Sequence, residues 1–103
     1  VLKLLNSDHK EVTVFPDFIR RAIVFSDDNI VNYSLTQISI NELNLFVEGQ
    51  LRYFEKAKNS ILAFLEKLEI LNIQINKLEK LDHIKGTKLR RIKNEFNTPS
   101  RKL

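Results

Sequence analysis

The most informative part of the chain is residues 43–78, which read LNLFVEGQLRYFEKAKNSILAFLEKLEILNIQINKL. Spacings of four and three alternate along this segment without a slip, which is the a/d pattern of about five heptad repeats. A helix with this pattern buries one narrow stripe against another helix, so the segment predicts association with a protein rather than a reaction. The seam consists of Leu43, Val47, Gln50, Phe54, Ala57, Ile61, Phe64, Leu68, Leu71, Ile75 and Leu78, of which only Gln50 is polar.

The residues before the seam predict where its helix begins. Ser39 with Glu42 three residues later matches a capping box. Ile38 and Leu43 would supply the accompanying hydrophobic staple. A helix over residues 40–81 would be roughly 60 Å long. A compact domain of about 100 residues has a radius of gyration of only about 13 Å, so such a helix would project out of it. We therefore expect the helix to fold back or to be covered by another chain, and both outcomes describe an assembly module.

The first third of the chain has a different pattern. Residues 1–5 and 11–15 are short apolar or alternating runs around a polar turn at 7–10, which predicts a β-hairpin. Pro16 then opens a helix, because proline is tolerated at the first helical position. Residues 31–38 are expected to form a short strand. Residues 1–38 therefore predict a small α/β cap.

The last part of the chain, residues 86–103, is basic. Gly86 is a natural stop for the long helix, since glycine adopts the left-handed conformation at little cost. A short helix would follow, with apolar residues on one face and a basic face made of Lys88, Arg90, Arg91 and Lys93. That face predicts binding to nucleic acid, to an anionic membrane or to an acidic protein, with a merely solvated surface as the alternative.

The end of this basic part is expected to be a flexible tail, and it contains one further motif. Residues 98–102, Thr-Pro-Ser-Arg-Lys, resemble the phosphoacceptor pattern of proline-directed cyclin-dependent kinases, in which Ser/Thr-Pro is followed by a basic residue two positions on. A phosphate on Thr98 would add about two negative charges to a positive segment and so weaken anion binding or create a docking contact. The motif predicts a phosphoprotein under cell-cycle control.

The composition narrows the function classes. The 103 residues include 17 basic and 13 acidic side chains, for a formal net charge of +4. The chain has no cysteine, which removes disulfides and thiolate chemistry and suits a reducing compartment. Neither His9 nor His83 has a second metal ligand at helical or hairpin spacing. We therefore expect no enzyme activity, no metal, no cofactor and no transmembrane segment, and a location in the nucleus or the cytoplasm, with the nucleus preferred.

Several runs in the first half share a pattern with one known family. They are Leu2-Lys3-Leu4, Ser7-Asp8, Glu11-Val12-Thr13-Val14, Phe18-Ile19-Arg20-Arg21-Ala22, and Tyr33-Ser34-Leu35-Thr36-Gln37-Ile38 leading into Leu43, Phe46-Val47 and Tyr53. This half resembles the elongin C and cullin-adaptor branch of the BTB/POZ fold. The sequence departs from it at His9, where the family commonly has glycine. The resemblance implies an adaptor of a ubiquitin-ligase-type assembly, in which the cap binds a short helical motif.

Together these patterns predict an α+β chain that is mostly α. Its parts are a hairpin-and-helix cap over 1–38, a long coiled-coil-like helix over 39–85, and a short basic helix with a tail over 86–103. We expect a non-enzymatic scaffold subunit, with the elongin C-like adaptor and a nucleic-acid-binding module as alternatives. Burial in a homodimer or against a partner, at about 1.5 to 3 kcal/mol per large side chain, would involve Phe54, Ile61, Phe64, Leu68, Leu71, Ile75 and Leu78.

Overall fold

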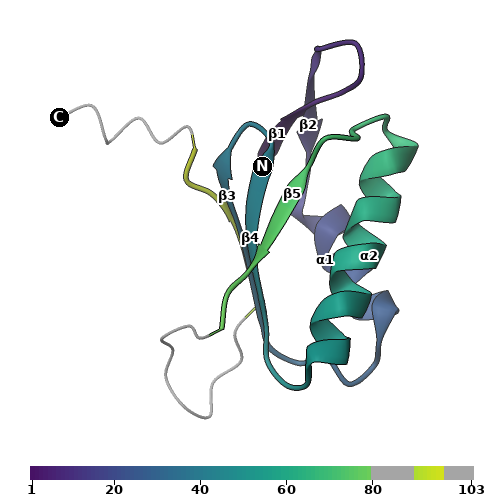
Figure 1. Cartoon of the computed structure of the whole chain (residues 1–103), viewed down its shortest axis with the longest axis vertical. Coiled ribbons are helices and arrows are strands. Elements are labelled where there is room, and N and C mark those ends of the chain that lie inside the picture. The colour runs from purple at the N-terminus through teal and green to yellow at the C-terminus, as the bar shows by residue number, and fades with distance from the viewer. Residues whose placement is uncertain (80–89, 97–103) are drawn as a thin grey trace, which may run out of the picture.

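The computed structural model describes residues 1–79 and 90–96 of the chain. Four strands form one sheet in the order β5-β4-β3-β6, and β1 and β2 form a separate antiparallel hairpin. Both helices lie on the same side of the four-stranded sheet (Figure 1). In chain order the elements are β1 (Leu2–Leu5), β2 (Glu11–Val14), α1 (Pro16–Ser26), β3 (Tyr33–Ser39), β4 (Glu42–Val47), α2 (Leu51–Lys67), β5 (Gln74–Lys77) and β6 (Arg90–Asn94).

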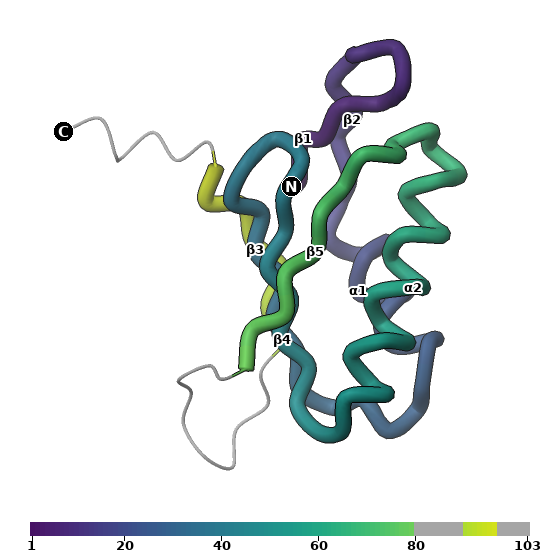
Figure 2. The backbone as a smooth tube through the Cα atoms, viewed as in Figure 1, coloured from purple at the N-terminus to yellow at the C-terminus, as the bar shows by residue number. Residues whose placement is uncertain are grey.

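The sheet is built around an antiparallel pair. β3 and β4 are joined by a tight turn at Ile40 and Asn41, with Leu35 opposite Leu45. β5 then runs parallel to β4, and β6 runs parallel to β3. Figure 2 shows how the chain leaves α2, passes the turn of the β1–β2 hairpin and returns along β4 as β5.

One core lies between the sheet and the helices. α2 buries Phe54, Ala57, Ile61 and Leu65, whose spacings of three, four and four define one helix face. α1 begins at its N-terminal proline and buries Ile19 and Ile23, one turn apart. The strands complete this core with Leu2, Leu4, Val14, Tyr33, Leu35, Leu43, Leu45, Val47 and Ile75.

A buried glutamine joins the hairpin to the sheet. The Gln37 side chain on β3 is 0% exposed. Its Oε1 accepts a hydrogen bond from the Lys3 backbone N–H at 2.9 Å, and its Nε2 donates to the Lys3 carbonyl at 2.7 Å. The same Nε2 donates to the Ser39 carbonyl at 2.9 Å. The side-chain amide therefore satisfies both backbone groups of Lys3 and fixes where β1 lies against β3.

The prediction of one long helix over 39–85 in a mostly α chain is wrong, because the described residues form a mixed α/β fold with two helices and six strands. The expected helix start at Ser39 is the end of β3, and residues 42–47 form β4. The error has a physical cause: a spacing of four is two strand periods as well as about one helical turn. Leu43, Leu45 and Val47 alternate, and so satisfy the strand period.

The helix predicted over the second half of the seam is wrong for the same reason. α2 ends at Lys67, and residues 74–77 form β5, in which Ile75 is buried while Gln74 is exposed. The apolar positions 71, 73 and 75 alternate with polar ones, which is the strand period again. Only the part of the seam between residues 54 and 64 lies within a helix of the structure.

The predicted basic helix after residue 88 is also wrong where the structure describes it. Arg90–Asn94 form β6, in register with Tyr33–Gln37 of β3. Alternation along the strand separates Arg91 and Lys93 from Ile92, which packs against the core. Gly86, Lys88 and Thr98 lie outside the described residues.

The predicted hairpin, the helix that opens at Pro16 and the following strand are present as β1–β2, α1 and β3. They do not form a separate cap, because their buried side chains share one core with α2 and β4. Neither helix within residues 1–79 and 90–96 has the length and apolar character needed to cross a membrane.

Candidate functional site

The outer face of the helix pair carries exposed aromatic side chains. Phe18 and Phe25 of α1 are 46% and 77% exposed, and Phe64 of α2 is partly buried. The rings of Phe18 and Phe64 are stacked, with centroids 5.9 Å apart and planes inclined by 12°. Because large apolar side chains are usually buried, a group of them at one place on a surface indicates an interaction site.

These rings line an open groove between α1 and α2 with a volume of about 370 Å³, here called the helix groove. Three of its lining residues, Ala22, Ser60 and Ala63, have small side chains. The Ser60 hydroxyl donates a hydrogen bond to the Ala22 carbonyl at 2.7 Å, which ties the two helices together there. The complete lining is Phe18, Arg21, Ala22, Phe25, Ser60, Ala63, Phe64 and Lys67.

The helix sequences explain why these residues stay outside. On α1, Ile19 and Ile23 face the core, while Phe18, Ala22 and Phe25 recur at spacings of four and three one position away. On α2, the stripe of residues 60, 63, 64 and 67 similarly lies beside the buried face. Each helix thus carries two adjacent stripes, and only the inner one is needed to pack on the sheet.

The helix groove is positively charged. Its two charged lining residues are Arg21 and Lys67, and none of the eight lining residues is acidic. The Arg21 guanidinium lies 5.9 Å from the centre of the Phe18 ring, within range of a cation–π contact. In the part of the chain that the structure describes, neither cation takes part in an ion pair.

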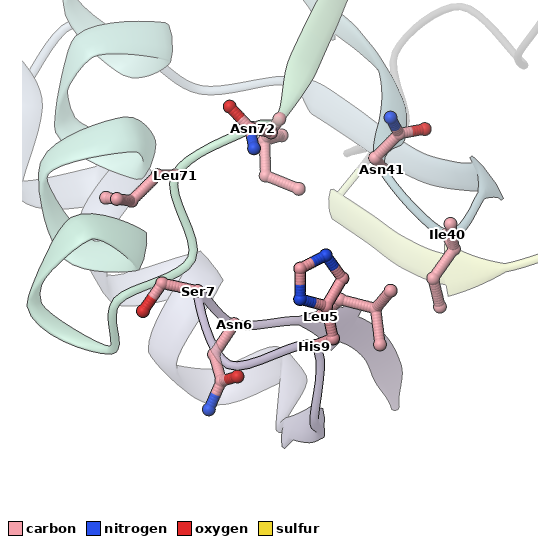
Figure 3. A pocket seen from close by; sticks show the side chains of 9 residues that line it. Leu5, Asn6, Ser7, His9, Ile40, Asn41, Leu71 and Asn72 are labelled. Carbon is pink, nitrogen blue, oxygen red and sulfur yellow. The ribbon is translucent and has the colours of Figure 1, made fainter.

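A second hollow, here called the loop pocket, lies at the end of the molecule where three loops meet (Figure 3). It has a volume of about 260 Å³. The loops are held together because Ser7 N–H donates to the Glu69 carbonyl at 2.8 Å and Gln74 N–H donates to the Asn41 carbonyl at 2.9 Å. The pocket is lined by Leu5, Asn6, Ser7, His9, Ile40, Asn41, Leu71, Asn72 and Ile73.

The loop pocket is lined by several hydrogen-bonding side chains. Figure 3 shows the His9 imidazole turned toward the hollow, at a residue whose φ of +62° places it in a left-handed turn. The Ser7 hydroxyl donates to the Glu69 carboxylate at 3.2 Å and not to His9, so the pocket lacks a serine–histidine pair. Over residues 1–79 and 90–96, no three His, Cys, Asp or Glu side chains are grouped as metal ligands.

The structure disperses the seven seam residues that the sequence predicts to bind a partner. Phe54, Ile61 and Ile75 are 4%, 0% and 9% exposed and belong to this chain's own core. Phe64 lines the helix groove, and Leu71 lines the loop pocket. Leu68 directly follows α2 and is 37% exposed, and Leu78 follows β5 and is half-buried.

Three of the four basic residues predicted to bind anions, Arg90, Arg91 and Lys93, lie on β6, and Lys88 lies outside the described residues. The Nε of Arg90 donates to the Val31 carbonyl at 3.1 Å. Lys93 forms an ion pair with Glu95 at 2.9 Å. Arg91 is exposed. Because side chains alternate along a strand and Ile92 packs against the core, Arg91 lies on the face of β6 that points away from the helices.

A buried tyrosine lies beside this strand. The Tyr33 side chain is 0% exposed, and its hydroxyl finds no hydrogen-bond partner within the described residues. Burial raises the pKa of this hydroxyl, and the charges of Arg20 and Arg90 partly oppose the rise.

Sequence reasoning missed most of the helix groove. Of its three phenylalanines, only Phe64 is among the residues that the sequence predicts to bind a partner, whereas the exposed Phe18 and Phe25 are not. The available signal was the second apolar stripe on α1, which widens its apolar face beyond what one packing partner requires. The contribution of Arg21 and Lys67 has no such signal, because it depends on how the two helices are placed beside each other.

Comparison with known proteins assigns no family to the chain. No family model, no curated protein and no solved structure matches it. The elongin C resemblance therefore rests only on the runs quoted above.

Proposed function

We propose that the protein is a non-enzymatic interaction module that binds a helical segment of a partner protein in the helix groove. The observation that carries the proposal is the exposed aromatic cluster, in which stacked Phe18 and Phe64 and the 77% exposed Phe25 line one open groove. Amphipathic helices commonly bind in such apolar grooves through anchors spaced three, four or seven residues apart.

The helix groove is suited to binding because it is already formed. Ile19 and Ile23 anchor α1 in the core, and the Ser60–Ala22 hydrogen bond fixes α2 beside it. A partner helix would therefore not need to order the groove, which lowers the entropic cost of association. Covering an exposed ring such as Phe25 would stabilise the complex by up to about 1.5 to 3 kcal/mol.

A selection experiment tests this proposal. A displayed library of amphipathic helical peptides would be selected on the whole chain, and the enriched peptides measured by fluorescence anisotropy against Phe25→Ser and Phe15→Ser. Phe15 is 55% exposed but does not line the groove, so it is a matched control. We expect Phe25→Ser to weaken binding at least about tenfold, equivalent to about 1.4 kcal/mol, and Phe15→Ser to leave it unchanged. Equal effects of the two variants, or no enriched peptide, would contradict the proposal.

A second candidate is nucleic-acid binding on the sheet face opposite the helices. The observation that favours it is Arg91, exposed on β6 in register with Ser34 of β3. Binding of single-stranded RNA or DNA that falls steeply with salt and is lost in Arg91→Glu would support it. Salt-independent or absent binding would remove this candidate.

The narrower roles remain predictions. An adaptor role in a ubiquitin-ligase-type assembly would be one form of the proposed module, with its helical ligand in the groove. Phosphorylation of Thr98, cell-cycle control and a nuclear location rest on the sequence motifs alone.

A further inference from the structure

We infer that the helix bound in the groove is acidic, with an apolar face flanked by Asp or Glu residues. The inference rests on the proposed function, because it names the partner chemistry of the same groove. The inference is based on charge complementarity. Two cations, Arg21 and Lys67, line a groove whose other lining residues are phenylalanines or small side chains, and an acidic helix would complement them.

The two cations of the groove have no ion-pair partner within residues 1–79 and 90–96. Two other cations of these helices are paired: Arg20 forms an ion pair with Asp17 at 2.8 Å, and Lys56 forms one with Asp27 at 2.9 Å. Arg21 and Lys67 instead line the groove, whose eight lining residues include no acidic side chain, and neither forms an ion pair with another described residue. An acidic partner would supply the missing counter-charges.

The two cations lie on different helices, so they would contact a bound helix at more than one place. Arg21 belongs to α1 and is held near the Phe18 ring, and Lys67 is the last residue of α2. Lys67 also complements the negative end of the α2 dipole, which is a structural role. A test therefore has to measure the stability of each variant as well as its binding.

A second copy of the chain is a poorer occupant. In a two-fold symmetric dimer through this surface, each groove would present Arg21 and Lys67 to the same two cations of the other copy. Like charges in an interface oppose association. An anionic membrane would match the charge, but a concave groove between two helices fits a helix better than it fits a lipid surface.

Three designed helical peptides with the same apolar face and flanking Glu, Gln or Lys residues test the inference by fluorescence anisotropy at low and high salt. Each exposed ion pair raises affinity by up to about fivefold. The Glu peptide should therefore bind about tenfold more tightly than the Gln peptide at low salt, and high salt should remove the difference. The Lys peptide should bind most weakly.

Two double charge-reversal variants test whether the preference for the Glu peptide comes from the cations of the groove. Arg21→Glu/Lys67→Glu and the control Lys10→Glu/Arg52→Glu each lower the formal net charge from +4 to 0. Lys10 and Arg52 are exposed and do not line the groove. The first variant should prefer the Lys peptide, and the control should keep the preference for the Glu peptide. If thermal unfolding shows that Arg21→Glu/Lys67→Glu does not fold, Arg21→Gln alone replaces it, because this variant leaves the α2 terminus unchanged.

The outcomes separate the inference from the proposed function. If all three peptides bind equally and Phe25→Ser weakens them all, the inference fails while the proposed function stands. If none of the peptides binds, both fail. If the Glu peptide does not bind but vesicles of anionic phospholipid do, and Arg21→Glu/Lys67→Glu abolishes this, a membrane replaces the peptide and the inference is overturned.

Discussion

Replacing Gln37 with leucine should destabilise the protein strongly, because this side chain is the polar link between the hairpin and the sheet. It makes three hydrogen bonds, two of them to the backbone of Lys3. Leucine would fill a similar volume but leave the Lys3 N–H and carbonyl without these partners. An unsatisfied buried polar group costs about 1 to 3 kcal/mol. Since the Lys3 bonds are only part-buried and water can replace some of them, we expect a total loss of about 3 kcal/mol.

Thermal and urea unfolding measure this loss. For a domain of this size, about 3 kcal/mol corresponds to a fall in Tm of roughly 12 to 24 °C. Gln50→Leu is a matched control, because Gln50 is exposed and its side chain makes no capping hydrogen bond to α2. Amide hydrogen exchange should show reduced protection of the Lys3 N–H only in Gln37→Leu. Equal stability of the two variants would refute the role of Gln37.

Three further stability predictions follow from burial and backbone geometry. Leu65→Ala should cost about 2 to 5 kcal/mol in urea unfolding, whereas Leu71→Ala, at a residue 57% exposed, should cost under about 1 kcal/mol; a long helix with one buried seam would reverse this order. Gly49→Ala should cost about 1 to 3 kcal/mol, because φ is +114° and an added Cβ would lie 2.7 Å from the Tyr53 ring; an unchanged Tm would contradict that geometry. Tyr33→Phe should keep or raise stability by up to about 2 kcal/mol, since it removes a buried hydroxyl that has no hydrogen-bond partner among residues 1–79 and 90–96. Because burial raises the pKa of Tyr33, the native protein should lose stability relative to Tyr33→Phe only as the pH rises above about 10; a constant difference across that range would refute the burial of this hydroxyl.

The sequence predicts local elements better than it predicts their assembly. Pro16 and the polar turn before it act through local backbone preferences, so the hairpin and α1 follow from short segments. Residues 43–47 show the limit of pattern reading, because Leu43 and Val47 are four apart in both a helix and a strand. The alternation through Leu45 favours the strand, but it is short and lies inside a longer helical pattern.

The candidate site could be predicted only in part. Phe64 appears in the predicted seam and lines the helix groove, whereas Phe54 is used in the chain's own core. Whether an apolar residue faces the core or a partner depends on which elements already cover it, and that is a tertiary property. The pairing of β5 with β4, which occupies the edge of β4 opposite β3, is likewise a tertiary property.

Solution NMR of the whole chain with the Glu-flanked peptide would show directly where the peptide binds. We expect intermolecular NOEs from the apolar side chains of the peptide to the rings of Phe18, Phe25 and Phe64. Backbone shift changes should be confined to α1 and α2, while β1–β2 and β5 are unaffected. A peptide whose NOEs and shift changes lie on the sheet face, or around His9 in the loop pocket, would contradict the assignment of the helix groove as the binding site.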